Sequence, residues 1–231
     1  ELTFTDAGHI LGSAVVNLSL FDDDKKLQLT FSGDVGRYND LLLKSPECFP
    51  AADYIICEST YGDRLHDVNE AAEEKLLKIV KETCVMNKGK LIIPAFSLGR
   101  TQEIVFTLDK MRNAGLLPNI NVYVDSPLST NATDIMRRYV DALNENLHEY
   151  VKKDPDPFGF NNLHYITKVE DSQRLNESKE PCIIISASGM AEAGRVKHHI
   201  KNNIRNEKNT ILMVGYCAPG SLGRYLMEGD K

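Results

Sequence analysis

The sequence predicts an α/β protein in which a β-rich segment precedes a three-layer domain with a mainly parallel sheet. Residues 1 to about 60 combine strand patterns with polar turn residues. From about Val68 onward, short apolar strands alternate with helices, which is the pattern of a parallel sheet wrapped on both faces. We therefore expect two domains, 1–64 and 65–231, with the boundary near Arg64.

The β-rich segment is expected to contain a hairpin and one further strand. Val15–Leu20 and Leu27–Phe31 flank the polar run Asp22–Lys25, which is typical of a hairpin turn. Asp53–Cys57 is the next expected strand, and it leads directly to Glu58.

The second part is expected to alternate between strands and helices. In Thr101–Asn113, for example, apolar residues recur at helical spacing, and Gly115 and Pro118 close the helix. Asp154–Gly159 contains two prolines and a glycine and is expected to be a loop. In chain order, the expected elements are helix Val68–Asn87, strand Leu91–Ile93, helix Thr101–Asn113, strand Asn121–Val124, helix Thr130–Val151, strand Cys182–Ile185, helix Ala191–Ile204 and strand Thr210–Val214.

Composition excludes several classes of protein. The net charge of -6 argues against a generic polyanion-binding surface, so nucleic-acid binding would need a local groove. The five cysteines contain no Cys-x-x-Cys pair, and Cys57 and Cys182 lie in apolar strands, which indicates buried free thiols in a reducing compartment. No apolar run approaches 18 residues and no basic leader opens the chain, so we expect a cytoplasmic protein without a membrane span or signal peptide.

Three polar residues, His9, Asp34 and Glu58, follow strand-like runs at nearly equal intervals. Side chains at strand ends are held rigidly yet stay accessible to solvent and substrate, as ligands of a catalytic metal must be. This pattern indicates two ligands and a supporting carboxylate around a hard divalent metal. Taken singly, each residue also fits a structural role, as a loop-capping histidine, a turn carboxylate or a surface carboxylate.

The segments around these residues resemble motifs of the β-CASP family of metallo-β-lactamase-fold nucleases, which includes the endonuclease subunit of the cleavage-and-polyadenylation machinery. The resemblance implies that 1–64 is part of an αββα sandwich of the metallo-β-lactamase type. It also implies that 65–231 is the β-CASP domain, which caps the metal cleft. The further motifs that carry the resemblance are Pro94–Glu103, Val124–Leu128, Ser186–Met190, Val214–Tyr216 and Gly220–Arg224.

The resemblance also implies roles for single residues. His9 would bind one zinc ion, Asp34 would bridge two, and Glu58, or its neighbour Asp63, would support an active-site histidine. A metal-bound hydroxide would attack the phosphodiester. The family's upstream His-x-His-x-Asp-His motif and its two later histidines are absent from these 231 residues. We therefore read the chain as an internal piece of a longer protein, which alone should neither hold the zinc pair nor cleave RNA.

Two strand-to-helix turns are candidate phosphate sites. Ser97–Arg100 and Ser188–Met190 each separate an apolar strand from a helix, where backbone N–H groups and the helix dipole favour an anion. Asp125–Pro127 forms a third turn of this kind, and such turns meet at one edge of a parallel sheet. Every doubly wound sheet has such turns, so each one alone is also explained by the fold. The expected phosphate-binding residues are Ser97, Arg100, Ser188, Gly189, Met190 and Lys197, with Arg195 nearby.

The adjacent pair His198 and His199 lies in a predicted helix. Adjacent helical residues do not share a face, which argues against a shared metal ion. We expect one histidine to face the core and the other to face solvent.

The predicted function is that of a zinc-dependent ribonuclease that acts on single-stranded RNA in RNA processing or decay. The alternatives are a DNA nuclease of the same superfamily, a non-catalytic scaffold subunit of an RNA-processing complex and a small-molecule metallo-hydrolase. The presence of His9, Asp34 and Glu58 counts against the scaffold. Pairing of the β-rich segment with a second copy, as a homodimer, is left open.

Overall fold

The computed structural model describes residues 1–23, 25–63 and 71–229. The chain forms two compact units, one from residues 1–69 and 139–155 and one from 70–138 and 156–231. The predicted boundary at Arg64 lies outside the described residues, as do the start of the helix expected from Val68 and the middle of the predicted hairpin turn. The domain limits 1–64 and 65–231 therefore stay a prediction.

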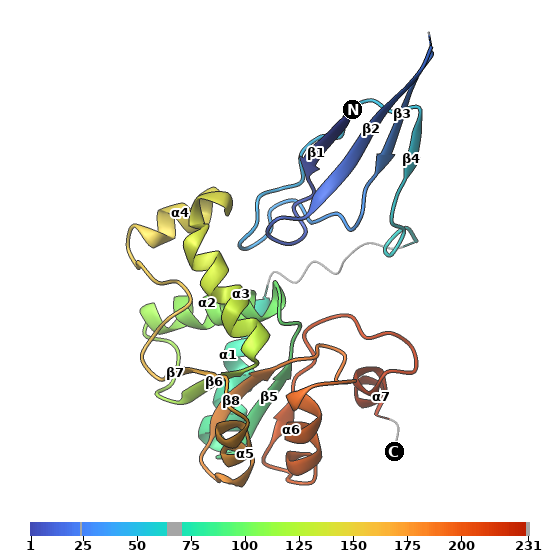
Figure 1. Ribbon diagram of the computed structural model, residues 1–231. Helices are drawn as coiled ribbons and strands as arrows, with labels where there is room; N and C mark the ends of the chain where they lie inside the picture. The colour runs from blue at the N-terminus through green and yellow to red at the C-terminus, as the bar shows by residue number, and fades with distance from the viewer. Residues whose placement is uncertain (24, 64–70, 230–231) are drawn as a thin grey trace. The chain divides into compact units, whose positions relative to one another are not determined.

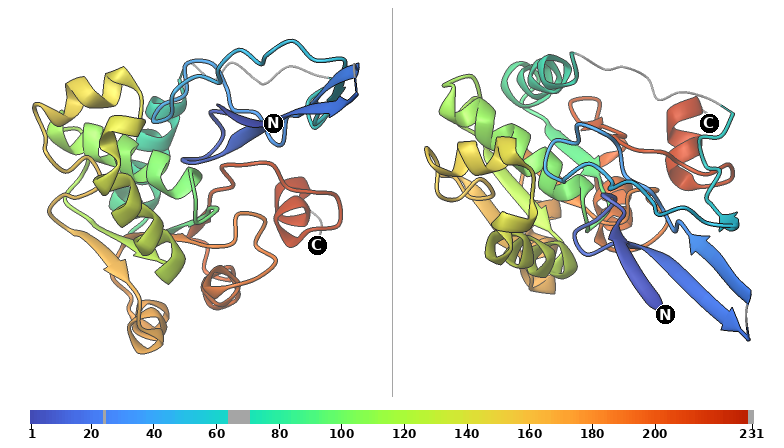
Figure 2. Two further views of the ribbon diagram at one scale, coloured as in Figure 1. Left: turned by 45° about the horizontal axis from the view of Figure 1, so that its top comes forward. Right: turned by 90° about the horizontal axis from the view of Figure 1, so that it is seen from above.

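The first unit is built on a mixed sheet (Figures 1 and 2). Its order is β1 (Leu2–Asp6), β2 (Ala14–Asp22), β3 (Lys25–Phe31) and β4 (Tyr54–Ile56). β2 is antiparallel to β1 and β3, while β4 pairs with β3 in parallel. β1, β3 and β4 thus run in one direction. The loops that follow them therefore leave the sheet at one edge, the edge formed by the carboxyl ends of these strands. The predicted strands are confirmed, and β1 is an additional one.

An apolar row crosses all strands of this sheet. The register aligns Phe4, Val16, Phe31 and Ile56 side by side, so these side chains share one face. Phe4 is 64% exposed and Ile56 is 56% exposed. Cys57 is exposed as well, so the prediction that its thiol is buried was wrong. The reason is that it follows β4, an edge strand whose three residues are all exposed.

The helix predicted over Thr130–Val151 is interrupted, so this prediction was wrong. The observed elements are α3 (Pro127–Arg138), a 3-10 turn (Val140–Ala142) and α4 (Glu145–Val151). Asn144 caps α4, because its side chain accepts a hydrogen bond from the backbone N–H of Leu147. Apolar residues recur on both sides of the break, and this continuity conceals it in the sequence.

Residues 139–155 belong to the first unit because α4 packs against the loop that follows β3. Leu42 in that loop and Leu147 in α4 are both fully buried. The backbone N–H of Asn144 donates to the carbonyl oxygen of Leu42 at 2.9 Å, and its side chain donates to the carbonyl oxygen of Asp40 at 2.8 Å. A segment distant in sequence therefore anchors the loop on which Asp34 lies.

The second unit contains a five-stranded sheet in which every neighbouring pair is parallel, in the order β7-β6-β8-β5-β9. The central strands β5 and β8 are buried along their whole length, as their apolar sequences predict. This confirms the predicted α/β class with a mainly parallel sheet. The strands are β5 (Lys90–Pro94), β6 (Asn121–Asp125), β7 (Leu163–Ile166), β8 (Cys182–Ser186) and β9 (Thr210–Ile211).

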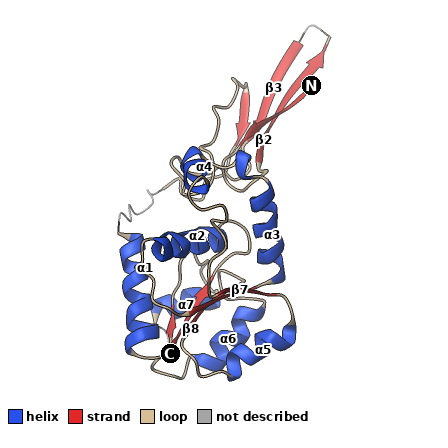
Figure 3. Cartoon of the chain, turned by 90° about the vertical axis from the view of Figure 1, so that its left-hand side faces the viewer, coloured by secondary structure: helices blue, strands red, loops and turns tan. Residues whose placement is uncertain are grey.

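Helices cover both faces of this sheet. Ile92 and Ile184 are aligned on one face, where Val196 of α6 packs on Ile92 and Leu175 of α5 packs on Ile184. Figure 3 shows α2 and α3 on the other side of β7 and β8 from α5 and α6. Among the described residues, no helix has both the length and the apolar character needed to cross a membrane. The helices are α1 (Ala72–Val80), its π-helical continuation Lys81–Met86, α2 (Arg100–Asn113), α5 (Val169–Glu177), α6 (Arg195–Asn203) and α7 (Leu222–Glu228).

Candidate functional site

The loops after β1, β3 and β4 bring the three predicted metal-site residues together. His9 Nε2 lies 3.8 Å from Asp34 Oδ2, and their side chains are 44% and 71% exposed. Glu58 Oε1 accepts a hydrogen bond from Val35 N at 2.7 Å, so its carboxylate lies beside the Asp34–Val35 peptide. An imidazole and two carboxylates therefore gather at one edge of the sheet and are open to solvent.

Glycines allow the loops to approach so closely. The backbone N–H of Gly36 donates to the carbonyl oxygen of Ala7 at 2.8 Å. A Cβ on Gly36 would lie 1.7 Å from the carbonyl oxygen of Gly8, a distance that no side chain tolerates. Gly8 itself has a φ of +61°, in the left-handed region that favours glycine. The loops that carry His9 and Asp34 are thus held together by their backbones.

Tyr54–Cys57 do not bury the base of Glu58, because these residues and Glu58 itself are exposed. Glu58 is held from its backbone, whose N–H donates to Ser32 Oγ at 3.1 Å. With its carboxylate on Val35 N, Glu58 joins the loop after β4 to the loop after β3. Its position suits a residue that orients Asp34.

A divalent metal fits the donors His9 and Asp34 in part. An imidazole nitrogen and a carboxylate oxygen 3.8 Å apart can turn toward one ion. Catalytic zinc, however, normally has at least three protein ligands. No group of three or more His, Cys, Asp or Glu side chains suited to a metal occurs in the described part of the chain. Among the described residues, His9 and Asp34 are therefore two candidate donors, and the carboxylate of Glu58 lies beside them.

The predicted phosphate turns of the second unit share one edge of the parallel sheet. Pro94 of β5 and Asp125 of β6 both pair in register with Ser186 of β8, so the three strands end at one level. The turn after β8 packs directly on the turn after β5, because a Cβ on Gly189 would lie 2.7 Å from the ring of Phe96. The arrangement that the sequence predicts is present.

Ser97 and Arg100 lie on the β5 side of this edge. Ser97 Oγ is 3.2 Å from Ser126 Oγ, so two hydroxyl groups from neighbouring turns meet there. The guanidinium of Arg100 forms an ion pair with Glu103 in the first turn of α2, and its side chain is 36% exposed. The positive charge of Arg100 is therefore partly balanced but open to solvent.

Ser188, Gly189 and Met190 form a tight turn before α6, which begins at Arg195 and not at Ala191 as predicted. The φ of Ala191 is +60°, so a regular helix cannot run through it. Ser188 N donates to the carbonyl oxygen of Ala193 at 3.1 Å, and Ser188 Oγ accepts from Ala193 N at 3.2 Å. Lys197 is exposed in the first turn of α6.

The sequence predicts that Arg195 lies near a phosphate, but its guanidinium instead binds other groups of the protein. Its Nη1 donates to Asp125 Oδ1 at 2.7 Å and its Nη2 to the carbonyl oxygen of Thr167 at 2.7 Å. His199 Nε2 lies 2.6 Å from Asp125 Oδ2. His199 is fully buried and His198 is exposed, which confirms the expected division of the pair.

Asp125 is the centre of this buried network and was not identified as such from the sequence. Burial alone raises the pKa of Asp125, but hydrogen bonds from His199, Ser172 and Arg195 outweigh it and hold the pKa below its ordinary value. Asp125 is therefore a charged group that ties the start of α6 to the end of β6. The signal in the sequence, an aspartate at a strand end, does not reveal its partners.

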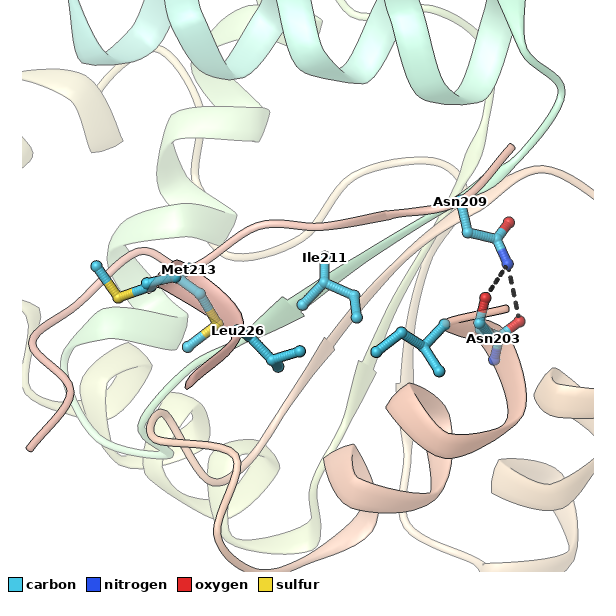
Figure 4. A pocket seen from close by; sticks show the side chains of 7 residues that line it. Asn203, Asn209, Ile211, Met213 and Leu226 are labelled. Atoms are coloured by element: carbon cyan, nitrogen blue, oxygen red, sulfur yellow. Dashed lines mark hydrogen bonds between the residues drawn. The ribbon is translucent and has the colours of Figure 1, made fainter. Parts of the chain in front are cut away.

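A hollow beside the edge strand β9 is visible in Figure 4. Ile211, Met213 and Leu226 point into it, and Asn209 donates hydrogen bonds to Asn203 at its rim. None of its lining residues is titratable at neutral pH. The hollow therefore lacks the groups that acid–base or metal chemistry needs.

Comparison with known proteins places these features in a family. A family model described as the Beta-Casp domain matches residues 101–226, which is more than half of the chain. The chain is 38% identical over its whole length to an RNase J-like protein of Methanocaldococcus jannaschii, of which it covers 52%. It is 32% identical, over 96% of its length, to a ribonuclease of Thermus thermophilus, of which it covers 50%.

A third relative is the transcription termination factor FttA of Methanocaldococcus jannaschii, 34% identical over the whole chain, which covers 36% of that protein. The chain thus spans about half of these curated relatives, or less. The family model covers β6 to β9, nearly all of α2, the helices α3 to α6 and most of α7. It therefore includes the turn Ser188–Met190 and the Asp125 network, whereas the turn Ser97–Arg100 lies just before it. The resemblance seen in the motifs is confirmed, and the chain belongs to the β-CASP family.

Proposed function

We propose that the protein to which this chain belongs is a zinc-dependent ribonuclease that acts on single-stranded RNA in the cytoplasm. The observation that carries the proposal is the meeting of His9, Asp34 and Glu58 at one sheet edge in a β-CASP chain. The names of two relatives, an RNase J-like protein and a ribonuclease, support RNA as the substrate.

In this proposal His9 and Asp34 are two of the zinc ligands, and further ligands come from parts of the protein outside this chain. Zinc, when bound, lowers the pKa of water and so supplies a nucleophile at neutral pH. Glu58 acts on Asp34 through the hydrogen bond to Val35 N, which fixes the loop between them. The exposure of His9 and Asp34 leaves room for a substrate phosphate.

The turns at the edge of the parallel sheet would bind phosphates of the same RNA. Ser97 offers a hydroxyl group, and Arg100 and Lys197 offer positive charge that solvent can reach. Gly189 and Met190 would act through their backbone N–H groups, since amides before a helix favour anions. These contacts would orient the chain and leave the choice of sequence to other parts of the site.

The proposal is tested with the intact protein and a labelled single-stranded RNA, beside DNA of the same sequence. We expect the wild type to cleave the RNA and Asp34→Asn to lose the activity. Asp171→Asn is the matched control, because Asp171 is a partly exposed carboxylate on α5, paired with Arg174.

Cleavage of DNA but not RNA would favour a DNA nuclease of the same superfamily and overturn the proposed substrate. No cleavage of either by the wild type with bound zinc would favour the scaffold. Equal cleavage by wild type and Asp34→Asn would remove Asp34 from the site.

A further inference from the structure

Helix α6 and the turn after it carry an unusual density of positive charge. Between residues 195 and 208 the basic residues are Arg195, Lys197, Lys201, Arg205 and Lys208, and the single acidic residue is Glu207. The chain as a whole has a net charge of -6, so this stretch opposes the general balance. Arg195 is accounted for by its ion pair with Asp125, but the remaining four are exposed.

Helix stability does not explain this arrangement. Lys197 lies in the first turn of α6, where a positive charge opposes the helix dipole, and that turn has no acidic residue. Lys197 and Lys201 are four residues apart, a spacing at which like charges destabilise a helix. Lys201, in the last turn, is the one that the dipole favours. The stability of α6 alone would therefore disfavour this arrangement of positive charges.

Helix α1 shows the ordinary pattern for comparison. It and its continuation carry Lys75, Lys78 and Lys81, interspersed with three glutamates, of which Glu82 pairs with Lys78 at 3.8 Å. Acidic residues stand in its first turn and a lysine in its last, as the helix dipole favours. The exposed lysines of α1 are thus locally neutralised, whereas those of α6 are not.

The basic residues of α6 form a line that starts at the proposed phosphate turn. The backbone N–H of Val196 donates to the carbonyl oxygen of Ala187, which ties the start of α6 to that turn. Positions four apart lie one above the other on a helix, about one 5.4 Å turn apart. Lys197 and Lys201 follow this spacing, and both line one hollow, together with Glu192 and His198. Arg205 and Lys208 lie in the turns that follow the end of α6.

We propose that the exposed basic residues of α6 and of the turns after it, Lys197, Lys201, Arg205 and Lys208, bind the phosphate backbone of single-stranded RNA outside the cleavage site. Spaced point charges suit a chain of phosphates, and α6 carries no Phe, Tyr or Trp on which a base could stack. Binding there is therefore independent of sequence. The inference rests on the proposed function for its substrate, and it adds a second RNA contact beyond the reacting phosphate.

The test uses the intact protein with Lys201→Gln, Arg205→Gln and Lys208→Gln combined, which leaves Lys197 in place. The matched control combines Lys75→Gln, Lys78→Gln and Lys81→Gln on α1, which removes the same charge. Binding of a long labelled RNA is measured by fluorescence anisotropy over a series of salt concentrations. A contact with single-stranded nucleic acid contributes about 0.7 to the slope of log affinity against log salt, so three contacts contribute about 2.

We expect the α6 variant to lose about 2 from this slope and the α1 control to keep the wild-type slope. A short RNA that fills only the cleavage site should bind and react equally in all three proteins. An unchanged slope in the α6 variant, or an equal loss in the α1 control, would overturn the proposal. Because anisotropy does not require turnover, an absence of cleavage would count against the proposed function alone.

Discussion

Glu58 offers the sharpest perturbation of the candidate metal site, because two substitutions separate its charge from its hydrogen bond. Its carboxylate accepts the N–H of Val35 at 2.7 Å, next to Asp34. Glu58→Gln keeps an acceptor oxygen of the same reach and removes the charge. Glu58→Ala removes both and releases the loop that carries Asp34.

The magnitudes follow from the geometry. A hydrogen bond to a charged group contributes about 1.5–3 kcal/mol and one to a neutral group about 0.5–1.5 kcal/mol. Glu58→Gln therefore weakens the link to Val35 by about 1 kcal/mol, and solvent reduces this because Glu58 is exposed. Loss of a residue that orients a metal ligand typically costs about 10- to 100-fold in activity or metal affinity. We expect turnover to fall about 10-fold in Glu58→Gln, with zinc retained, and about 100-fold in Glu58→Ala.

The assay measures turnover of labelled RNA and zinc content in the intact protein, with thermal unfolding to confirm that each variant folds. Glu47→Gln is the matched control, because Glu47 also accepts a backbone N–H, that of Asp6 at 3.3 Å, in the same unit. Wild-type turnover in both Glu58 variants would refute the reasoning. An equal loss in Glu47→Gln would show that the effect is general weakening of the unit.

Three further predictions concern a close contact in the first unit, the Asp125 network of the second unit, and self-association of the chain. Gly36→Ala places a Cβ 1.7 Å from the carbonyl oxygen of Gly8, so urea unfolding should show a loss of about 1–3 kcal/mol; stability equal to wild type would contradict the close approach of these loops. Asp125→Asn removes the buried carboxylate that binds Arg195 and His199 and should cost about 3–5 kcal/mol. Because the folded-state pKa of Asp125 is depressed below 3.8, its contribution to stability is complete above about pH 4 and is lost as the pH falls toward the folded pKa. The wild type should therefore lose more stability than Asp125→Asn between pH 4 and pH 2, and parallel curves would speak against the charged network. The 231-residue chain alone should self-associate through its exposed apolar row. The double variant Phe4→Ser with Ile56→Ser should reduce this association in sedimentation experiments. A wild-type chain that is monomeric at all concentrations would exclude the homodimer.

The sequence reveals the parallel sheet because its central strands are short apolar runs such as Leu91–Ile93, whose burial on both faces leaves a direct trace in composition. The strand-end residues are recoverable for the same reason, since a polar residue after an apolar run marks the edge of a sheet. Even the contrast between His198 and His199 follows from helical geometry alone.

Other features depend on partners that the local sequence does not identify. The sequence alone indicates that Arg195 is a candidate phosphate ligand. In the structure it donates to Asp125, which is distant in the sequence. Helix α5 has a largely polar sequence and buries only Ser172 and Leu175. Its sequence therefore lacks a strong apolar periodicity from which a helix could be predicted. The break before α4 depends on Asn144, whose side chain and backbone are both engaged by α4 and the loop after β3. In each case tertiary contacts override a local pattern.

The proposed function places His9 and Asp34 in one metal site that cleaves RNA. The direct measurement is zinc content together with cleavage of labelled RNA, for the intact wild type and for the double variant His9→Ala with Asp34→Asn. Both side chains are exposed and bury no core surface, so the variant should keep the far-ultraviolet circular dichroism of the wild type. We predict that it loses bound zinc and RNA cleavage together. Cleavage at the wild-type rate by the double variant would contradict the account.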